Sequence, residues 1–260
     1  GADLSPQEQM TVLSLLGLSD INVDDYDIIS ITNADEHEYL DKYLDASIIG
    51  TRALSSVLVV GKEAGNGIHV TTKNISYCTE GMYRNALLTA GIEDADITVA
   101  GPFSISGTAA LVGAIKAYET MTGEEIDDEN LDAANDELVL TGKLVEDIGD
   151  SEKAEDLMAL VKQEVAENKL TSAEDIQNVV DQACDQLDIQ LSEENQKQIA
   201  ELMKKIEGLD LDVDKLKDQA KDLYQKLENL DFHVDKESVG NFFTRIIDAI
   251  VKFFQGLFGK

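Results

Sequence analysis

Tryptophan is absent from this chain of 260 residues, and proline occurs only twice, at Pro6 and Pro102. Because proline breaks helices while Glu, Lys, Leu and Ala favour them, this composition is typical of a largely helical protein. Cysteine also occurs only twice, at Cys78 and Cys184. Two cysteines supply neither a disulfide framework nor the spacing of a zinc site, and the sequence leaves open whether they pair or remain free thiols.

Positive charge is scarce as well. The chain has 21 basic residues against 52 acidic ones, which gives a net charge of −31. Nucleic acid is therefore excluded as a class of partner, because phosphate binding needs a basic surface. The chain begins Gly1-Ala-Asp and shows no basic segment followed by an apolar one. We interpret Gly1 as what remains after an export signal has been removed.

Residue patterns that would identify a reaction are also missing. The three histidines, His37, His69 and His233, lie in different segments, and none is spaced for metal binding with another His or Cys. The acidic run at 127–132 lacks the glycine and the spaced glutamate of a calcium loop. The sequence contains no phosphate-loop motif and no nucleophile elbow. It therefore predicts no catalytic residue, no metal and no cofactor, and an enzymatic activity is the less favoured interpretation.

Residues 1–123 show strand and helix patterns in alternation. Strands are expected at 26–32, 54–60, 68–77 and 95–100, with helices at 34–45 and 79–90 and a further helix at 107–121. This β-α-β-β-α-β order is that of the split βαβ unit of ferredoxin-like sandwiches. The uninterrupted apolar run Val57–Val60 predicts a central strand. Gly61–Gly67 joins two expected strands, so a hairpin tip is favoured over a phosphate loop.

Strand patterns stop after Gly123. Helices are expected at 127–148, 151–168, 171–188, 192–207 and 212–231, so residues 124–238 form an acidic helical region. From Ile199 to Val234 apolar residues recur at steps of three or four. Such a seam either pairs copies of the chain, as in a coiled coil, or packs within one chain. Gly208 and the aspartates after it favour a break into two helices. The fold class is therefore α+β, with an N-terminal sheet and helices followed by an all-helical C-terminal region.

The last segment, 239–260, differs from the rest of the chain because it is basic and rich in phenylalanine. On a helical wheel its apolar and polar residues fall on opposite arcs, which predicts an amphipathic helix. Arg245, Asp248 and Lys252 interrupt the apolar run, so the segment is not a transmembrane helix. The helix either docks on a protein partner or a membrane surface, or covers the core of its own chain. The proposed interaction surface consists of Phe242, Phe243, Ile246, Ile250, Phe253, Phe254, Leu257 and Phe258.

One segment carries a candidate ligand site. Ser104, Ser106, Gly107 and Thr108 gather where a strand is expected to lead into a helix. Hydroxyl groups and free backbone N–H groups at a helix N-terminus can bind a phosphate or a carboxylate. The same residues also suit an ordinary helix cap. The sequence therefore predicts a possible small-anion site here without separating the two interpretations.

Three blocks of sequence, 67–75, 83–95 and 99–119, resemble a family of exported proteins from Gram-positive bacteria. That family is number one thousand and two in the series of domains of unknown function, and the resemblance covers nearly the whole chain. It implies export and supplies no catalytic residues. We therefore expect an exported, non-catalytic binding protein outside the cell or at the cell envelope. The alternative is a ligand-binding α+β domain with its site at Ser104–Thr108.

Overall fold

The computed structural model describes residues 1–19, 25–209 and 211–217, all of which belong to the first of two compact units, Gly1–Lys221. The predicted C-terminal helix therefore lies outside the described residues. Three strands form one sheet: β1 (Ser56–Gly61), β2 (Ile68–Ile75) and β3 (Ala95–Ile105). Five helices belong to the same half of the chain: α1 (Pro6–Leu15), α2 (Asn33–Leu40), α3 (Ala46–Ile49), α4 (Glu80–Thr89) and α5 (Thr108–Thr122). Four more helices follow: α6 (Asp128–Ile148), α7 (Ser151–Asn168), α8 (Ala173–Gln186) and α9 (Glu193–Glu207).

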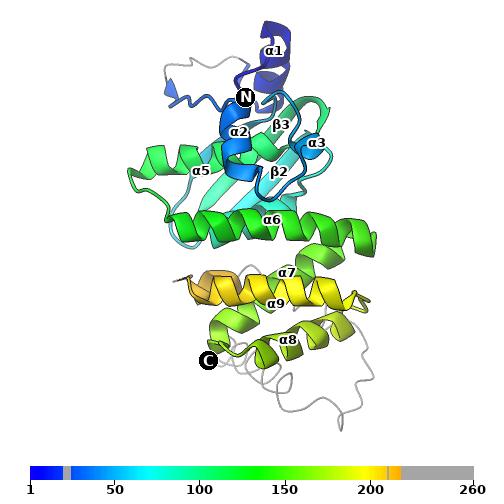
Figure 1. Ribbon diagram of the computed structural model, residues 1–260. Helices are drawn as coiled ribbons and strands as arrows, with labels where there is room; N and C mark the ends of the chain where they lie inside the picture. The colour runs from blue at the N-terminus through cyan, green and yellow to red at the C-terminus, as the bar shows by residue number, and fades with distance from the viewer. Residues whose placement is uncertain (20–24, 210, 218–260) are drawn as a thin grey trace, which may run out of the picture. The chain divides into compact units, whose positions relative to one another are not determined.

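The α+β class predicted from the sequence is correct, and α6 lies between the layer containing the sheet and the helices α7 to α9 (Figure 1). The four helices from α6 to α9 start and end within two residues of the predicted bounds. Their ends are set by local signals, such as the side chain of Ser192 at the start of α9 and left-handed Gly149 at the end of α6. The predicted break after α9 is also confirmed, because that helix ends at Glu207.

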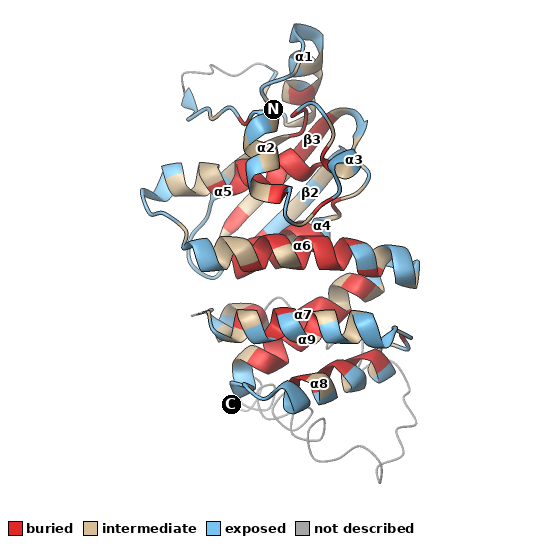
Figure 2. Cartoon of the chain, in the orientation of Figure 1, coloured by how far each residue is buried: buried red, intermediate tan, exposed pale blue. Residues whose placement is uncertain are grey.

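The sheet has the order β1-β3-β2. β3 pairs with β2 in parallel and with β1 in antiparallel orientation. Helices α4 and α5 pack on one face, where Val59, Ile97 and Val70 stand side by side in register. The main core lies between this face and the helices, and it extends through Leu138 into α6 (Figure 2). The proposed boundary between residues 123 and 124 therefore falls at a helix end, but one core spans it.

The ferredoxin-like strand order is wrong for the described residues. No strand forms at 26–32, because Thr32 caps α2 and Ile31 packs in a small separate cluster beside α5. The expected helix at 34–45 is too long: α2 ends at Leu40, and a turn leads from it to α3, which begins only at Ala46. The expectation that Val57–Val60 is a central strand is also wrong, since β1 pairs on one side only.

The segment Gly61–Gly67 is not a hairpin tip. It joins β1 to β2, but β3 lies between these two strands, so the segment crosses the start of β3. Asp94, just before β3, holds it there. The Asp94 carbonyl accepts from the Lys62 N–H at 3.0 Å, and the Asp94 carboxylate accepts from the Gly67 N–H at 2.7 Å. Sequence patterns found the strands but could not show which strand is placed between the other two.

After α9 the chain returns to the sheet layer. Leu216 is buried in the main core, and Lys215 forms an ion pair with Asp94 at 2.6 Å. Lys217 pairs with Glu167 on α7 at 2.9 Å. In the first half of the apolar seam, Ile199 and Leu202 are buried within their own chain. The seam beyond residue 217 lies outside the described residues, so pairing of chains through 199–234 stays a prediction.

Candidate functional site

The predicted ligand site lies where β3 leads into α5, with its residues in different degrees of exposure. Ser104 is exposed and Ser106 is half-buried, whereas Gly107 and Thr108 are buried. Gly107 has a φ of 95°, and a Cβ atom there would lie 2.5 Å from the Tyr83 hydroxyl oxygen. Glycine is therefore required at this position by both backbone conformation and space. Gly107 supplies no side chain to cap α5, so the first turn of that helix needs a partner from elsewhere.

That partner is the carboxylate of Glu36. Glu36 lies on α2 and is only 1% exposed, and its Oε1 accepts from the Thr108 hydroxyl at 2.5 Å. The backbone N–H of Ala109 in the first turn of α5 also favours the charged form of this carboxylate and lowers its pKa. Negative charge is favoured at a helix N-terminus by the dipole and by the free N–H groups. The predicted anion site thus holds a carboxylate of the chain itself, and the sequence analysis missed Glu36.

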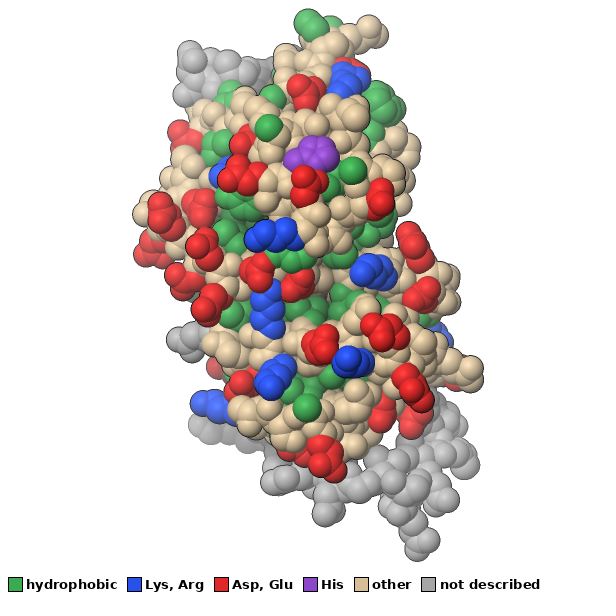
Figure 3. All heavy atoms as spheres, viewed as in Figure 1, with side chains coloured by type: hydrophobic (Ala, Val, Ile, Leu, Met, Phe, Trp, Pro, Cys, Tyr) green, Lys and Arg blue, Asp and Glu red, His purple; other side chains and the backbone are tan. Residues whose placement is uncertain are grey.

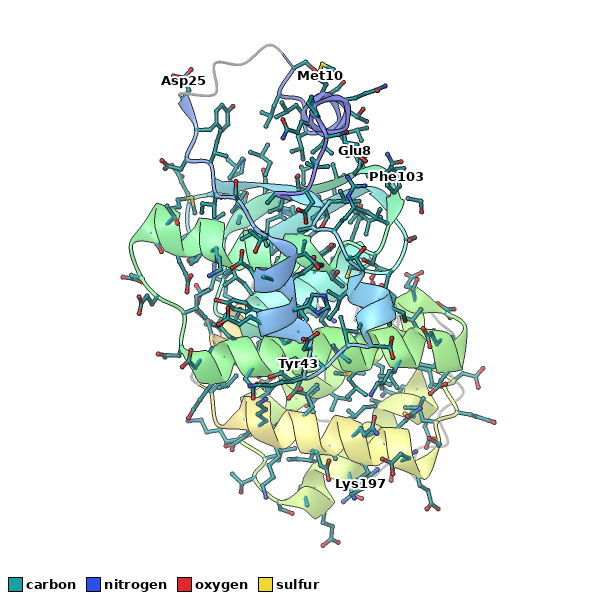
Figure 4. The ribbon with its side chains drawn as sticks, turned by 45° about the horizontal axis from the view of Figure 1, so that its top comes forward. Glu8, Met10, Asp25, Tyr43, Phe103 and Lys197 are labelled. Carbon is teal, nitrogen blue, oxygen red and sulfur yellow. The ribbon has the colours of Figure 1, made fainter. Side chains whose placement is uncertain are left out.

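The Glu36 carboxylate is not fully satisfied by these contacts. In the described part of the chain no donor forms a hydrogen bond with its buried Oε2. The Asn33 side chain lowers the pKa of this carboxylate, and its N–H donates to the Gly50 carbonyl at 3.4 Å. Burial raises the pKa of Glu36, although the hydrogen bond from Thr108 opposes the rise. A small apolar cluster holds α2 against α5. Tyr43, which follows α2 in the chain, lies where this cluster meets α6 (Figure 4).

A thiol and a phenol lie beneath the same turn. The Tyr83 hydroxyl donates to the Gly107 carbonyl at 2.5 Å, and the Cys78 N–H donates to the Ser106 carbonyl at 3.0 Å. Burial raises the pKa of the Cys78 thiol to about 12 and that of Tyr83 well above its usual value. Neither group ionises near neutral pH, so neither is a ready nucleophile. Cys184 is also a buried free thiol, so the two cysteines do not pair.

Two further polar contacts, one partly buried and one buried, join helices to each other. At the start of α4 the Thr79 hydroxyl donates to Oε1 of Glu155 at 2.5 Å. At the end of α4 the Thr89 hydroxyl donates to Oε2 of Glu137 at 2.5 Å, and Lys162 forms an ion pair with Glu137. Glu36, Glu155 and Glu137 therefore each accept a hydrogen bond from a threonine at a helix end. Sequence reasoning missed them because no local spacing pairs residues so distant along the chain.

The remaining predictions concern the histidines, metal binding and the C-terminal interaction surface. His37 and His69 belong to α2 and β2, and no group of His, Cys, Asp and Glu in the described ranges could hold a metal ion. The interaction surface from Phe242 to Phe258 lies outside those ranges. Acidic side chains are scattered over the face shown in Figure 3, with lysines between them. Among the helices that are described, none is both long and apolar enough to cross a membrane.

Comparison with known proteins places the chain in a family. A protein of Bacillus subtilis (strain 168), named "Uncharacterized protein YpuA", is 38% identical over 260 residues, which covers 98% of this chain and 88% of that protein. No solved structure matches the chain. Residues 1–223 match the family described as "Protein of unknown function (DUF1002)". The resemblance noted in the sequence is thus confirmed, and the chain belongs to the DUF1002 family.

Proposed function

We propose that this protein is an exported, non-catalytic binding protein that acts at the cell envelope or outside the cell. Its partner is a polypeptide that adds an extended, basic segment to the free edge of β1. The observation that supports this proposal most directly is the position of β1, an apolar strand at the edge of the sheet. Export is supported by the resemblance of the three sequence blocks to an exported family.

The two edges of the sheet differ. At the β2 edge the Thr72 N–H donates to Oε1 of Glu80 at 2.9 Å, and the register shifts between Lys73 and Ile75 around left-handed Asn74. A side-chain partner, a charge and an irregular backbone all discourage pairing with another strand. β1 has none of these features within its apolar run Val57–Val60. Among the described residues, this run pairs in the sheet with β3 alone.

The end of β1 also presents apolar side chains to solvent. Val60 is 41% exposed, and Met121 at the end of α5 is 45% exposed and lies against Gly61. Large apolar groups that gather at a strand edge are typical of surfaces for strand addition, in which backbone hydrogen bonds supply affinity and side chains supply specificity. The partner is therefore expected to carry apolar side chains in alternation with polar ones.

Charge determines the sign of those polar side chains. Glu124 and Glu125, a few residues after Met121, are exposed, and the whole chain carries −31. A basic segment is attracted to this end of the sheet, while nucleic acid and anionic lipid are repelled. A basic polypeptide is the partner that satisfies both the backbone edge and the charge.

The test uses a fluorescein-labelled peptide of alternating valine and lysine as the probe. Binding is measured by fluorescence anisotropy to the full chain and to a variant with Leu58→Lys and Val60→Lys. Charged residues on an edge strand block pairing, so the variant should bind at least about tenfold more weakly, a difference of about 1.4 kcal/mol. A peptide with glutamate in place of lysine should bind neither protein.

The matched control places the same charges on the opposite edge. His69→Lys with Thr71→Lys changes the net charge of the protein by the same amount, but on β2, and should leave the affinity for the peptide near that of the unmodified chain. Equal weakening by both double variants would show that general charge attraction, and not the edge of β1, holds the peptide. Binding to neutral lipid vesicles that is independent of β1 would also contradict a polypeptide partner.

The second candidate function is binding of a small anion or ligand at Ser104–Thr108. One observation favours the chemistry of that site: the start of α5 already holds a carboxylate, that of Glu36. The same observation limits access, because Glu36 and Thr108 are each 1% exposed. A ligand would have to take the place of Glu36.

A further inference from the structure

The first turn of α5 has the properties of an anion site that is already filled. Its N-cap residue, Gly107, offers no side-chain hydrogen bond to the helix. The Thr108 hydroxyl donates to the Glu36 carboxylate instead, and the Ala109 N–H favours the charged form of that carboxylate. The site is therefore completed by a residue that is 72 positions away from Thr108 in the sequence.

The fit of Glu36 is incomplete on one side. Its Oε2 is buried, and within the described ranges no donor reaches it with hydrogen-bond geometry. A buried carboxylate oxygen without a partner has lost its water and gained nothing in return, so it lowers the stability that this contact could supply. A second feature of the same contact is that α2 packs on α5 through a small cluster that is separate from the main core. Glu36 thus acts as a ligand supplied by the chain itself: its Oε1 accepts a hydrogen bond, and its Oε2 accepts none from the described residues.

We propose that the N-terminus of α5 is a binding site for small carboxylates, that Glu36 is its resident ligand, and that a free carboxylate enters only by replacing the Glu36 side chain. The ligand class follows from the donors: a hydroxyl and a backbone N–H within one helical turn suit a planar carboxylate. The space left by one glutamate side chain limits the ligand to the size of formate or acetate. Phosphate is too large for it, and chloride is a single atom that does not fill the space of a planar carboxylate.

The experiment compares the unmodified chain with Glu36→Ala in thermal unfolding, with sodium formate, acetate, phosphate or chloride added at equal ionic strength. The Glu36→Ala variant should melt at a lower temperature and regain about 2–4 °C in a saturable way with formate and acetate, but not with phosphate or chloride. The unmodified chain should show no saturable gain with any of the four salts. The double variant Glu36→Ala with Thr108→Val should not be rescued, because the donor hydroxyl is gone.

Each contrary result overturns the proposal. Equal gains in the unmodified chain and in Glu36→Ala would place the carboxylate site elsewhere, and no gain in either would show that α5 does not bind free carboxylates. A control variant, Glu8→Ala, removes the half-buried carboxylate that completes the capping box of α1 with Ser5, and it should not respond to formate. Rescue of that variant would show that the effect is not specific to α5.

If Glu36→Ala does not fold, a double-mutant cycle on conservative variants still decides the question. Glu36→Gln and Thr108→Val each weaken the contact without opening a large space. If Glu36 binds at the start of α5 as a ligand, the loss of melting temperature in the double variant should be clearly smaller than the two single losses added together. Additive losses would show that the two residues act independently, and the site as proposed would not exist.

Discussion

Lys162 on α7 and Glu137 on α6 form an ion pair in which neither side chain has any exposed surface, with Nζ 3.0 Å from Oε1. The same ammonium group donates to the Asn85 carbonyl at 2.9 Å and to the Thr89 hydroxyl at 3.1 Å. One cation thus joins α4, α6 and α7. Burial lowers the pKa of Lys162, and the nearby Glu137 charge opposes that change.

Replacing Lys162 by Met should destabilise the protein strongly. The Glu137 carboxylate would stay buried without its counter-charge, and removal of one partner of such a pair costs about 3–5 kcal/mol. The double variant Lys162→Met with Glu137→Leu should recover part of this loss. Urea unfolding followed by circular dichroism measures both. The matched control is Lys197→Met on α9, whose ion pair with Glu201 is exposed and should matter little (Figure 4). Equal losses at the two lysines would contradict this account of the buried pair.

The stability of the protein should depend on pH through Glu36. Because its pKa in the folded chain is raised above the usual 4.5, the folded state holds this proton more tightly than the unfolded state. The contribution of Glu36 to stability is therefore fully present below about pH 4.5 and declines as pH rises through the folded pKa. Glu36→Gln cannot titrate, so its stability relative to the unmodified chain should increase over that range.

His37 on the same helix lowers the pKa of Glu36, and the charge of Glu36 in turn raises that of the Gly1 amino group. Cys78 and Tyr83 beneath the turn stay uncharged over this pH range, because burial raises the pKa of both. Urea unfolding of both proteins at a series of pH values isolates the glutamate, because these neighbours are common to both. A difference between the two proteins that does not change with pH would show that Glu36 keeps its ordinary pKa.

Gly107→Ala should lower the free energy of unfolding more than Gly123→Ala does, because Gly123 is a left-handed glycine with space around it. A Cβ atom at Gly107 would lie 2.5 Å from the Tyr83 hydroxyl and 2.6 Å from Ile75 Cγ2. Gly123, at the end of α5, has a φ of 75° and no atom within 4 Å of the added Cβ. Both variants bear the left-handed penalty of about 1–2 kcal/mol, and Gly107→Ala should lose about 1–3 kcal/mol more. Equal melting temperatures for the two variants would contradict the close packing of this turn.

The two thiols should react slowly with Ellman's reagent in the folded protein. Burial raises the pKa of Cys78 to about 12 and that of Cys184 to about 11, so little thiolate is present at mildly alkaline pH. In urea both thiols should react at the rate of free cysteine and give two equivalents. Rapid labelling of the folded chain, or fewer than two thiols after unfolding, would contradict buried free cysteines.

Local signals explain which elements the sequence predicted well. The bounds of α7, Ser151–Asn168, agree with the expected helix because an aspartate cap lies just before it and a periodic apolar face runs along it. The break after α9 follows from Gly208 and the aspartates beyond it in the same way. Such features depend on residues a few positions apart, so a single sequence contains all the information they need.

The strand predictions failed where the answer depended on a distant partner. Tyr26–Thr32 has the residues of a strand, yet none of the described strands pairs with it. Val57–Val60 has the residues of a central strand, yet β3 takes that position because the crossover through α4 returns the chain between β1 and β2. Side-chain preference selects an extended backbone, but only the positions of the neighbouring strands decide whether it pairs and on how many sides.

The candidate site, too, was determined partly by local sequence and partly by contacts between distant residues. The residues Ser106, Gly107 and Thr108 alone determined that a helix begins there and that its start suits an anion, since backbone N–H groups are free at every helix N-terminus. Only the tertiary structure decided what the anion is. Glu36 reaches Thr108 because α2 packs against α5, and contacts between residues so far apart in the chain leave no pattern in a single sequence.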